Sequence, residues 1–286
     1  MPRRTPHPIL GWSAFPKAIF PAYPSPTGVR VLDVEQHRDW YLSQVQAPVG
    51  GAVLDLGCGK GADLLALAAR IDDPRASFVG IDASPDHVRE AQVATTDSRV
   101  SFAHSKVGST LDFDDGVFDV LMTQEVLECF PDLDAFVPEL ARVLRPEGQI
   151  VASHYDWDTQ AFTGSDRDRT RRVLRAWAEW EQSWMDHTDP WMGRRLWGYL
   201  QGSGLFEGEV RVRVMTNTEF SEPWHGYRMA HWFRGLVKRG MVSEADYEGF
   251  MSDLEEASAA GRYFWSVNRY VYVGRRVAAD GQRGRP

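Results

Sequence analysis

Residues 53–61 read Val-Leu-Asp-Leu-Gly-Cys-Gly-Lys-Gly, and this stretch decides the fold. An apolar run ends here in a turn with three alternating glycines, and a helical pattern follows from Ala62. Only a backbone without Cβ atoms lets another group lie directly against such a turn. A second apolar run, 77–81, ends in Asp82. A strand, a glycine turn, a helix and a strand tipped by a carboxylate are typical of half a nucleotide-binding unit.

The same alternation continues along the chain. Apolar runs at 52–56, 77–81, 100–104, 117–123 and 149–153 are separated by helical patterns. Five such strands predict a parallel sheet with helices on both faces. Beyond residue 155 the strict alternation ends. The pattern there predicts helices at 167–184, 193–202, 227–239 and 243–259 and strands at 209–216 and 263–273. Near the start of the chain, a helix is expected at 33–45, with Asp33 as its cap.

Bulk composition limits the classes of function. The 286 residues can form one large domain or a domain with a cap. A net charge of -8 disfavours binding to nucleic acid through phosphates, so no nucleic-acid partner is expected. Two cysteines, Cys58 and Cys129, cannot supply a disulfide framework or a four-ligand zinc site, which suggests a cytoplasmic location. No secretory signal and no membrane-spanning run is expected.

Four segments together resemble the class I S-adenosylmethionine-dependent methyltransferases that act on small molecules. They are 53–61, Val-Gly-Ile-Asp-Ala-Ser at 79–84, Phe-Asp-Val at 118–120, and Leu-Ala-Arg-Val-Leu-Arg-Pro-Glu-Gly-Gln at 140–149. The resemblance implies an α/β fold: a Rossmann-like, seven-stranded, mostly parallel sheet with helices on both faces and a helical cap formed by insertions. The expected parts are an N-terminal segment that is partly a lid (1–28), the donor-binding core (29–156), a cap insertion (157–190), core continuation (191–216), a second cap insertion (217–262), the last core strand (263–275) and a disordered tail (276–286).

The resemblance also implies S-adenosyl-L-methionine as the cofactor. The backbone of the glycine turn can approach its methionine part, and Asp55 can accept from its ammonium group. Asp82 has two oxygens for the two ribose hydroxyls. The family often has an acid after the third strand, but residues 105–109 read Ser-Lys-Val-Gly-Ser. The predicted cofactor-binding residues are Asp55, Gly57, Cys58, Gly59, Asp82, Ala83, Gly108, Ser109, Gln124, Glu125 and Val126.

Catalytic candidates follow the fifth strand. The predicted catalytic residues are His154, Tyr155 and Asp156. His154 is the candidate general base, or else a histidine that hydrogen-bonds a neighbouring loop. Asp156 can orient this imidazole, hold an amine, or cap the following helix.

The two insertions are rich in aromatic residues. One interpretation is an aromatic-walled cap over a small organic substrate, with Trp157, Trp184, His231 and Trp232 as substrate-contacting residues. The other is that the tryptophans only attach the cap to the sheet. Arg171, Arg172 and Arg175 form either a solvated face or an anchor for a substrate carboxylate. No metal site is proposed, because His225 and His231 lie six residues apart.

The sequence therefore predicts an enzyme that transfers a methyl group in line to oxygen, nitrogen or carbon of a small organic molecule. The expected substrate is aromatic or amino-acid-like and belongs to specialised metabolism. Two alternatives remain open: a nicotinamide-dependent oxidoreductase, and a non-catalytic S-adenosylmethionine-binding protein. A monomer and a homodimer are equally compatible with the sequence.

Overall fold

One seven-stranded sheet organises the computed structural model, which describes residues 32–106, 108–182, 185 and 187–278. The strand order is β3-β2-β1-β4-β5-β7-β6. β1 to β5 run parallel, and β7 lies antiparallel between β5 and β6. The strands are β1 (Ala52–Leu56), β2 (Ser77–Asp82), β3 (Val100–His104), β4 (Phe118–Gln124), β5 (Leu144–Phe162), β6 (Phe206–Asn217) and β7 (Trp265–Arg276). The predicted fold class is confirmed, while the expected lid segment 1–28 lies outside the described residues, as does the tail from residue 279.

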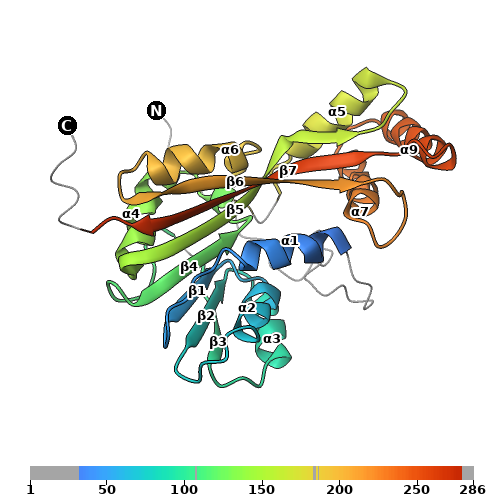
Figure 1. Ribbon diagram of the computed structural model, residues 1–286. Coiled ribbons are helices and arrows are strands. Elements are labelled where there is room, and N and C mark those ends of the chain that lie inside the picture. Colours follow the sequence, from blue (N-terminus) through green and yellow to red (C-terminus); the bar gives the residue numbers. More distant parts are fainter. Residues whose placement is uncertain (1–31, 107, 183–184, 186, 279–286) are drawn as a thin grey trace, which may run out of the picture.

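Helices cover both faces of the sheet (Figure 1). They are α1 (Leu32–Leu42), α2 (Ala62–Ala68), α3 (Pro85–Ala94), α4 (Leu133–Val143), α5 (Arg167–Ala178), α6 (Met192–Leu196), α7 (His225–Trp232), α8 (Arg234–Lys238) and α9 (Glu244–Ala259), with a 3₁₀ turn at Leu127–Cys129 and a π turn at Trp197–Gln201. Among the helices of the described ranges, none combines the length and apolar character that a membrane crossing requires.

Strand β5 shows how the two faces are separated. Successive side chains of a strand point to opposite faces of the sheet. Val151 therefore packs with Tyr41 and Leu64, on the side of α1 and α2. Ile150 packs with Phe136 and Leu196, on the side of α4 and α6. Both faces are covered, which explains why the central strands are apolar throughout.

A third core forms where β5, β6 and β7 run past the parallel strands. Phe162 pairs with Trp265, and Trp265 pairs with Asn217 across the next ladder. Helices α5, α7 and α9 gather at this end of the molecule (Figure 1), and α8 contacts α7 and α9. Their apolar side chains, including Trp177, Phe233 and Phe250, pack on the strand ends. This cap is thus built on an extension of the main sheet.

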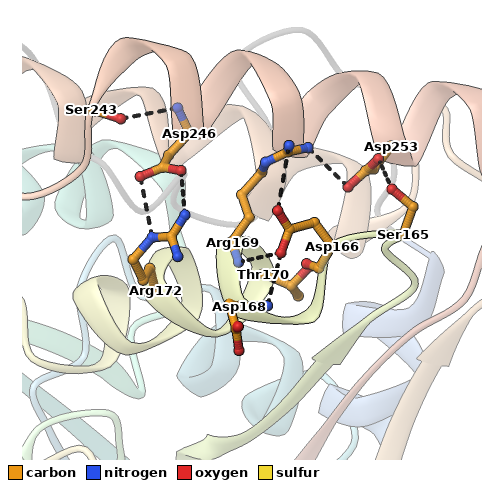
Figure 2. Close-up of polar contacts among 9 residues, drawn as sticks. All are labelled: Ser165, Asp166, Asp168, Arg169, Thr170, Arg172, Ser243, Asp246 and Asp253. Carbon is orange, nitrogen blue, oxygen red and sulfur yellow. Dashed lines mark hydrogen bonds and ion pairs between the residues drawn. The ribbon is translucent and has the colours of Figure 1, made fainter.

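Two ion pairs join α5 to α9 at the outer edge of the cap (Figure 2). Arg172 Nη2 lies 2.6 Å from Asp246 Oδ1, and Arg169 Nη1 lies 3.3 Å from Asp253 Oδ2. Asp253 also accepts a hydrogen bond from Ser165 Oγ at 2.5 Å. The three arginines considered as a carboxylate anchor each have an acidic partner already: Arg171 with Asp168, Arg172 with Asp246, and Arg175 with Glu179. These pairs favour the solvated-face interpretation over a carboxylate anchor.

Several predicted element boundaries are wrong. The strand expected at 149–153 runs from Leu144 to Phe162, because β7 pairs with it as far as Phe162 and Phe118 of β4 pairs with Leu144. The first residues of the insertion 157–190 therefore extend the sheet. The helix expected at 167–184 ends at Ala178.

Two further helices differ from their predicted extent. The helix expected at 227–239 is divided into α7 and α8, with a one-residue break at Phe233. Helix α1 spans Leu32–Leu42, so Asp33 lies inside its first turn and does not precede it.

Candidate functional site

The glycine turn after β1 leaves open space at one of its three glycines. Gly57, Gly59 and Gly61 have φ values of 75°, 53° and 79°, a region that favours glycine. A Cβ atom at Gly57 would lie 2.1 Å from Val126 Cγ2, and one at Gly61 would lie 2.4 Å from Phe102 Cζ. At Gly59 such an atom would meet no described atom within 4 Å. The outer glycines allow close packing, whereas Gly59 presents bare backbone where a ligand can approach.

Asp82 holds this turn from the end of β2. Its Oδ2 accepts from the Gly59 N–H at 2.8 Å, and its Oδ1 accepts from the Ser84 N–H at 2.8 Å. Burial alone would raise the pKa of Asp82, but hydrogen bonds from His87, Ser84 and Gly59 outweigh it and lower the pKa. The carboxylate is therefore ionised, and its Oδ2, which accepts from Gly59 alone among the described residues, retains capacity for a hydrogen bond from a ribose hydroxyl.

Asp55 is a buried acid on β1, two residues before the first glycine of the turn. Only 4% of its surface is exposed, and none of the described residues donates a hydrogen bond to its carboxylate. Burial, and then the negative charges of Asp63 and Asp82, raise the pKa of Asp55 well above its usual range. A cationic group beside it would remove this penalty. The residue therefore suits the predicted contact with a ligand ammonium group.

The backbone amides of the turn are already bonded within the protein. The N–H groups of Gly57 and Cys58 donate to Ile81 O at 2.8 and 3.0 Å. Burial raises the pKa of the Cys58 thiol, which therefore stays protonated. The turn thus offers a ligand the Cα face of Gly59 and not these amides.

The region expected to hold the adenine ring is more open. Ala83 O lies 3.1 Å from His104 Nε2, while Gly108 and Ser109 are exposed. No acid occupies residues 105–109. The cofactor contacts proposed for Ala83, Gly108 and Ser109 stay predictions. His104 lies beside Ala83 and was not among the residues predicted from the sequence.

Residues 124–126 leave β4 beside the turn. Val126 packs against Gly57, as the close approach above shows. The Gln124 side chain donates to Asp63 and accepts from Arg269. Glu125 has a φ of 54°, which is rare for a residue with a side chain. Backbone strain of this kind concentrates at functional sites.

Arg269 links three strands at the floor of the site. This residue of β7 is only 5% exposed. Its guanidinium donates to Gln124 Oε1 at 2.5 Å and to Ser153 Oγ at 3.2 Å, and lies 3.1 Å from Glu125 Oε1. The guanidinium carbon also lies 3.9 Å from the centre of the Tyr155 ring. Tyr155 therefore faces a buried cation.

His154 lies between two glutamates on the opposite face of β5. Its Nδ1 is 3.5 Å from Glu125 Oε2, and its Nε2 is 3.8 Å from Glu128 Oε1. The imidazole is 0% exposed, and burial chiefly lowers its pKa, against the raising effect of Glu125. A general base must reach the proton it removes. His154 does not line the cavity beside Glu128, so its role as a general base stays a prediction.

Asp156 does not orient His154. Its Oδ1 accepts from Arg194 Nη2 at 2.6 Å, and its Oδ2 pairs with Arg194 Nε. Asp156 is fully buried, so this pair fastens α6 to β5. The geometry favours a structural role over the predicted catalytic one.

A small cavity lies between the end of β4 and the cap. Its volume is about 20 Å³, and its lining includes Glu128, Trp157, Trp177 and Trp180. Burial, followed by the charges of Glu125 and Asp189, raises the pKa of Glu128 well above its usual range. Trp157, one of the predicted substrate residues, lines this cavity, and its contact with a substrate stays a prediction. Glu128 is the acid in this lining, and sequence reasoning missed it.

Two other predicted substrate residues, His231 and Trp232, do not line this cavity. Trp184 lies outside the described residues. His231 is exposed, with Nδ1 2.8 Å from Tyr227 O, and its ring stacks with Phe220. Trp232 packs edge-on against His225, at 5.7 Å between ring centroids. The cavity lining contains neither residue.

A family model described as a methyltransferase domain matches residues 49–202, which is 154 of the 286 residues. The matched part contains the glycine turn, Asp82, Glu128 and nearly all the site described above. The chain belongs to the class I S-adenosylmethionine-dependent methyltransferases. S-adenosylmethionine is accordingly the cofactor of this methyltransferase domain. The described residues fit this cofactor. The open face of Gly59 suits its methionine part, and Asp55, to which no described residue donates a hydrogen bond, suits its ammonium group. The ionised Asp82 suits its ribose.

Individual relatives match shorter stretches. Nocamycin O-methyltransferase of Saccharothrix syringae is 35% identical over 111 residues, which cover 38% of this chain and 39% of that protein. The 2-methyl-6-phytyl-1,4-hydroquinone methyltransferase of Synechocystis sp. is 29% identical over 217 residues, which cover 73% of this chain and 62% of that protein. The methyltransferase thus spans less than two thirds of the length of these curated relatives.

A solved structure shows the same fold. The YcgJ protein from Bacillus subtilis aligns over 86% of this chain and 100% of that chain, with a TM-score of 0.56 and 15% sequence identity. The aligned share of this chain is larger than the part that the methyltransferase-domain model matches. This similarity concerns the fold alone.

Proposed function

We propose that this methyltransferase moves a methyl group from S-adenosylmethionine to a small organic molecule held between the end of β4, the end of β5 and the cap. One observation carries the proposal. Val126 packs on the glycine turn, and Glu128, two residues further along, lines the cavity beneath the cap tryptophans. One short segment therefore joins the donor side to the acceptor side. Two relatives are named for small molecules, nocamycin and a phytyl hydroquinone, which supports a substrate of specialised metabolism.

The donor's contribution is a methyl group on a positively charged sulfur. The protein contributes the placement of the donor relative to the acceptor. Asp82 would hold the ribose, Asp55 the ammonium group, and the Gly59 backbone would lie against the methionine part. Fixed placement of two reactants accounts for a large share of the acceleration in such reactions, up to roughly 7–11 kcal/mol.

The cavity surroundings would exclude water and manage a proton. Tryptophan walls remove the acceptor from solvent, which strengthens its polar contacts. Where the acceptor atom carries a proton, Glu128 is placed to take it, because its carboxyl group lines the cavity. His154 stands behind Glu128, with its Nε2 3.8 Å away, and would position that carboxyl group. Transfer to oxygen, nitrogen or carbon is compatible with this arrangement.

Calorimetry on the full chain tests the proposal. We expect S-adenosylhomocysteine to bind with one site per chain, and oxidised or reduced nicotinamide dinucleotides to give no heat. Labelled S-adenosylmethionine is then incubated with phenols, catechols, amines and amino acids, and we expect label in at least one acceptor. Binding of the dinucleotide alone would establish the oxidoreductase alternative. Binding of S-adenosylhomocysteine without transfer to any acceptor class would favour the non-catalytic alternative.

A further inference from the structure

Two glutamates and a histidine lie close together between the end of β4 and the middle of β5. One ligand atom from each of Glu125, Glu128 and His154 lies within 4.8 Å of the others. Glu125 and Glu128 follow β4, three residues apart, and His154 belongs to β5. Glu128 is 6% exposed and His154 is 0% exposed, so the cluster is shielded from water. Carboxylate oxygens and an imidazole nitrogen are ligands that divalent transition-metal ions accept.

The imidazole of His154 presents an unused lone pair to Glu128. Its Nδ1 lies 3.2 Å from Tyr155 O, and a carbonyl oxygen only accepts, so Nδ1 carries the ring proton. Nε2 therefore has a free lone pair, and this buried atom has no hydrogen-bonding partner. It lies 3.8 Å from Glu128 Oε1. Histidines that bind a metal commonly donate their other ring N–H to a carbonyl group, as Nδ1 does here.

The separation of these two atoms fits a bridging ion better than a direct hydrogen bond. Hydrogen bonds between nitrogen and oxygen span roughly 2.7–3.2 Å, so 3.8 Å is too long for a proton shared by Glu128 and His154. Zinc binds imidazole nitrogen and carboxylate oxygen at roughly 2.0–2.2 Å. Two such bonds together span up to about 4.1 Å, so one ion can reach both atoms where they stand.

One oxygen of Glu125 is fixed by the protein. Its Oε1 accepts from the Tyr155 N–H at 3.0 Å and lies 3.1 Å from the Arg269 guanidinium. Its Oε2 lies 3.5 Å from His154 Nδ1. Hydrogen bonds that hold a carboxylate in place are regular around metal-binding carboxylates. Oε2 is therefore the Glu125 oxygen left for an ion.

Charge balance at Glu128 also favours a cation. Across the described ranges, no lysine or arginine nitrogen comes within 4 Å of its carboxylate. The nearby Asp189 is a further acid, and its own partner is Arg195, at 2.7 Å. Buried charges in proteins are normally paired or coordinate metal ions. An ionised Glu128 beside a neutral His154 therefore leaves one negative charge for a bound ion to balance.

The small cavity beside Glu128 has room for a water molecule bound to such an ion. Its volume of about 20 Å³ suits one water. Its lining includes Gln182, Thr188 and Trp180, and the Trp180 indole N–H is buried without a hydrogen-bonding partner. A metal-bound water donates hydrogen bonds to amide and hydroxyl oxygens and accepts one from an N–H group. Three protein ligands and a water are the arrangement of catalytic zinc sites.

From this juxtaposition we propose that Glu125, Glu128 and His154 Nε2 bind one divalent transition-metal ion, with a water molecule in the cavity as a further ligand. The imidazole nitrogen favours Zn²⁺ and its neighbours in the first transition row over Mg²⁺ and Ca²⁺, which prefer oxygen ligands. The site goes beyond the proposed function, which needs no metal. Glu128 can bind the ion through one oxygen and keep the other for the proton of an acceptor.

Metal binding is measured without turnover. The full chain, prepared without a histidine tag and stripped with a chelator, is titrated with Mn²⁺, and the free ion is followed by electron paramagnetic resonance. We expect saturation at one ion per chain, and displacement by Zn²⁺ but not by an equal concentration of Mg²⁺. E128Q and H154Q should each weaken Mn²⁺ binding at least tenfold, because each removes a ligand. The matched control E179Q alters an exposed glutamate paired with Arg175 and should leave binding unchanged.

Electron spin echo spectroscopy on the wild-type chain loaded with Mn²⁺ decides the matter even where a variant does not fold, because a bound imidazole nitrogen modulates the echo. The absence of saturable binding, the absence of nitrogen modulation, or wild-type affinity in both E128Q and H154Q would each overturn the inference. S-adenosylhomocysteine binding is measured in parallel by calorimetry. Normal donor binding without metal binding would refute the metal site and leave the methyltransferase proposal intact.

Discussion

Tyr155 and Arg269 are direct cross-strand partners in β5 and β7, and the guanidinium carbon lies 3.9 Å from the centre of the phenol ring. Because opposite residues of an antiparallel ladder point to the same face, the register itself brings the cation over the ring. The same guanidinium reaches Glu125 on the far side of β5. One residue of the last strand thus connects the end of β4 with the middle of β5, close to the proposed acceptor site.

Removing that cation should destabilise the protein. R269M leaves Glu125 without its partner in a largely buried setting, so we expect a loss of about 3 kcal/mol in the free energy of unfolding. Urea denaturation followed by far-ultraviolet circular dichroism measures it. R171M, which removes an exposed pair with Asp168, should cost less than about 0.5 kcal/mol. Equal losses in the two variants would show that Arg269 is not a structural centre.

The glycine turn offers a matched pair of substitutions. A methyl group at Gly57 would collide with Val126, whereas one at Gly59 meets open space. Since both residues have positive φ, G59A should cost about 1–2 kcal/mol from backbone strain, and G57A more, about 3 kcal/mol. Thermal unfolding gives the stability order. Calorimetry should show that G59A, despite its smaller stability cost, weakens S-adenosylhomocysteine binding at least tenfold, because the added methyl group occupies the ligand's approach. A reversal of the stability order would contradict the packing argument.

Asp82 should control donor affinity. D82A removes the acceptor assigned to the ribose and the support of the Gly59 amide, so we expect S-adenosylhomocysteine to bind at least tenfold more weakly. D86A is the matched control, because Asp86 is exposed on α3 and pairs with Arg89. Titration calorimetry on both variants checks the expectation. Unchanged affinity in D82A would remove Asp82 from the donor site.

Stability should fall with acidification because of His225. Burial, and then the charges of Arg269 and Arg228, lower the pKa of His225 to about 3. The unfolded chain therefore binds a proton between pH 6.5 and 3 that the folded chain excludes, which costs about 1.4 kcal/mol per pH unit in that window. H225F should show a shallower decline in the free energy of unfolding between pH 6 and pH 4, measured by urea denaturation. H187Q, at an exposed histidine, should keep the wild-type slope, and an identical slope in H225F would disprove the assignment.

The donor half of the site could be predicted from sequence because its signals are local. Each of Gly57, Asp82 and Val126 stands within a few residues of a strand end, and parallel strands bring such ends to one edge of the sheet. The acceptor half of the site was harder to predict from the sequence. Asp156 is a carboxylate beside the predicted base, yet α6 supplies Arg194 to neutralise it. His231 and Trp232 lie in an aromatic insertion, and nothing in the sequence indicates which of its residues line the cavity.

Two of the missed residues did leave a trace in the sequence. Arg269 interrupts an apolar alternation of Trp265, Val267 and Val271, which marks a buried cation on an inward face. Glu128 follows Glu125 by three residues in a segment that is otherwise apolar. Neither signal names a partner, because the partners come from other strands and from the cap.

The sequence by itself determined the alternation of strands and helices, the glycine turn with its acid on the next strand, and therefore the family and its cofactor. These features depend on residue type and spacing along a few dozen residues. Only the tertiary structure decided that His154 lies next to Glu128, that Asp156 pairs with Arg194 of α6, and that Glu128 shares a small cavity with three tryptophans. Burial and charge balance at this site depend on side chains that the fold brings together from β4, β5, β7 and α5. Spacing along the chain does not predict the distances between them.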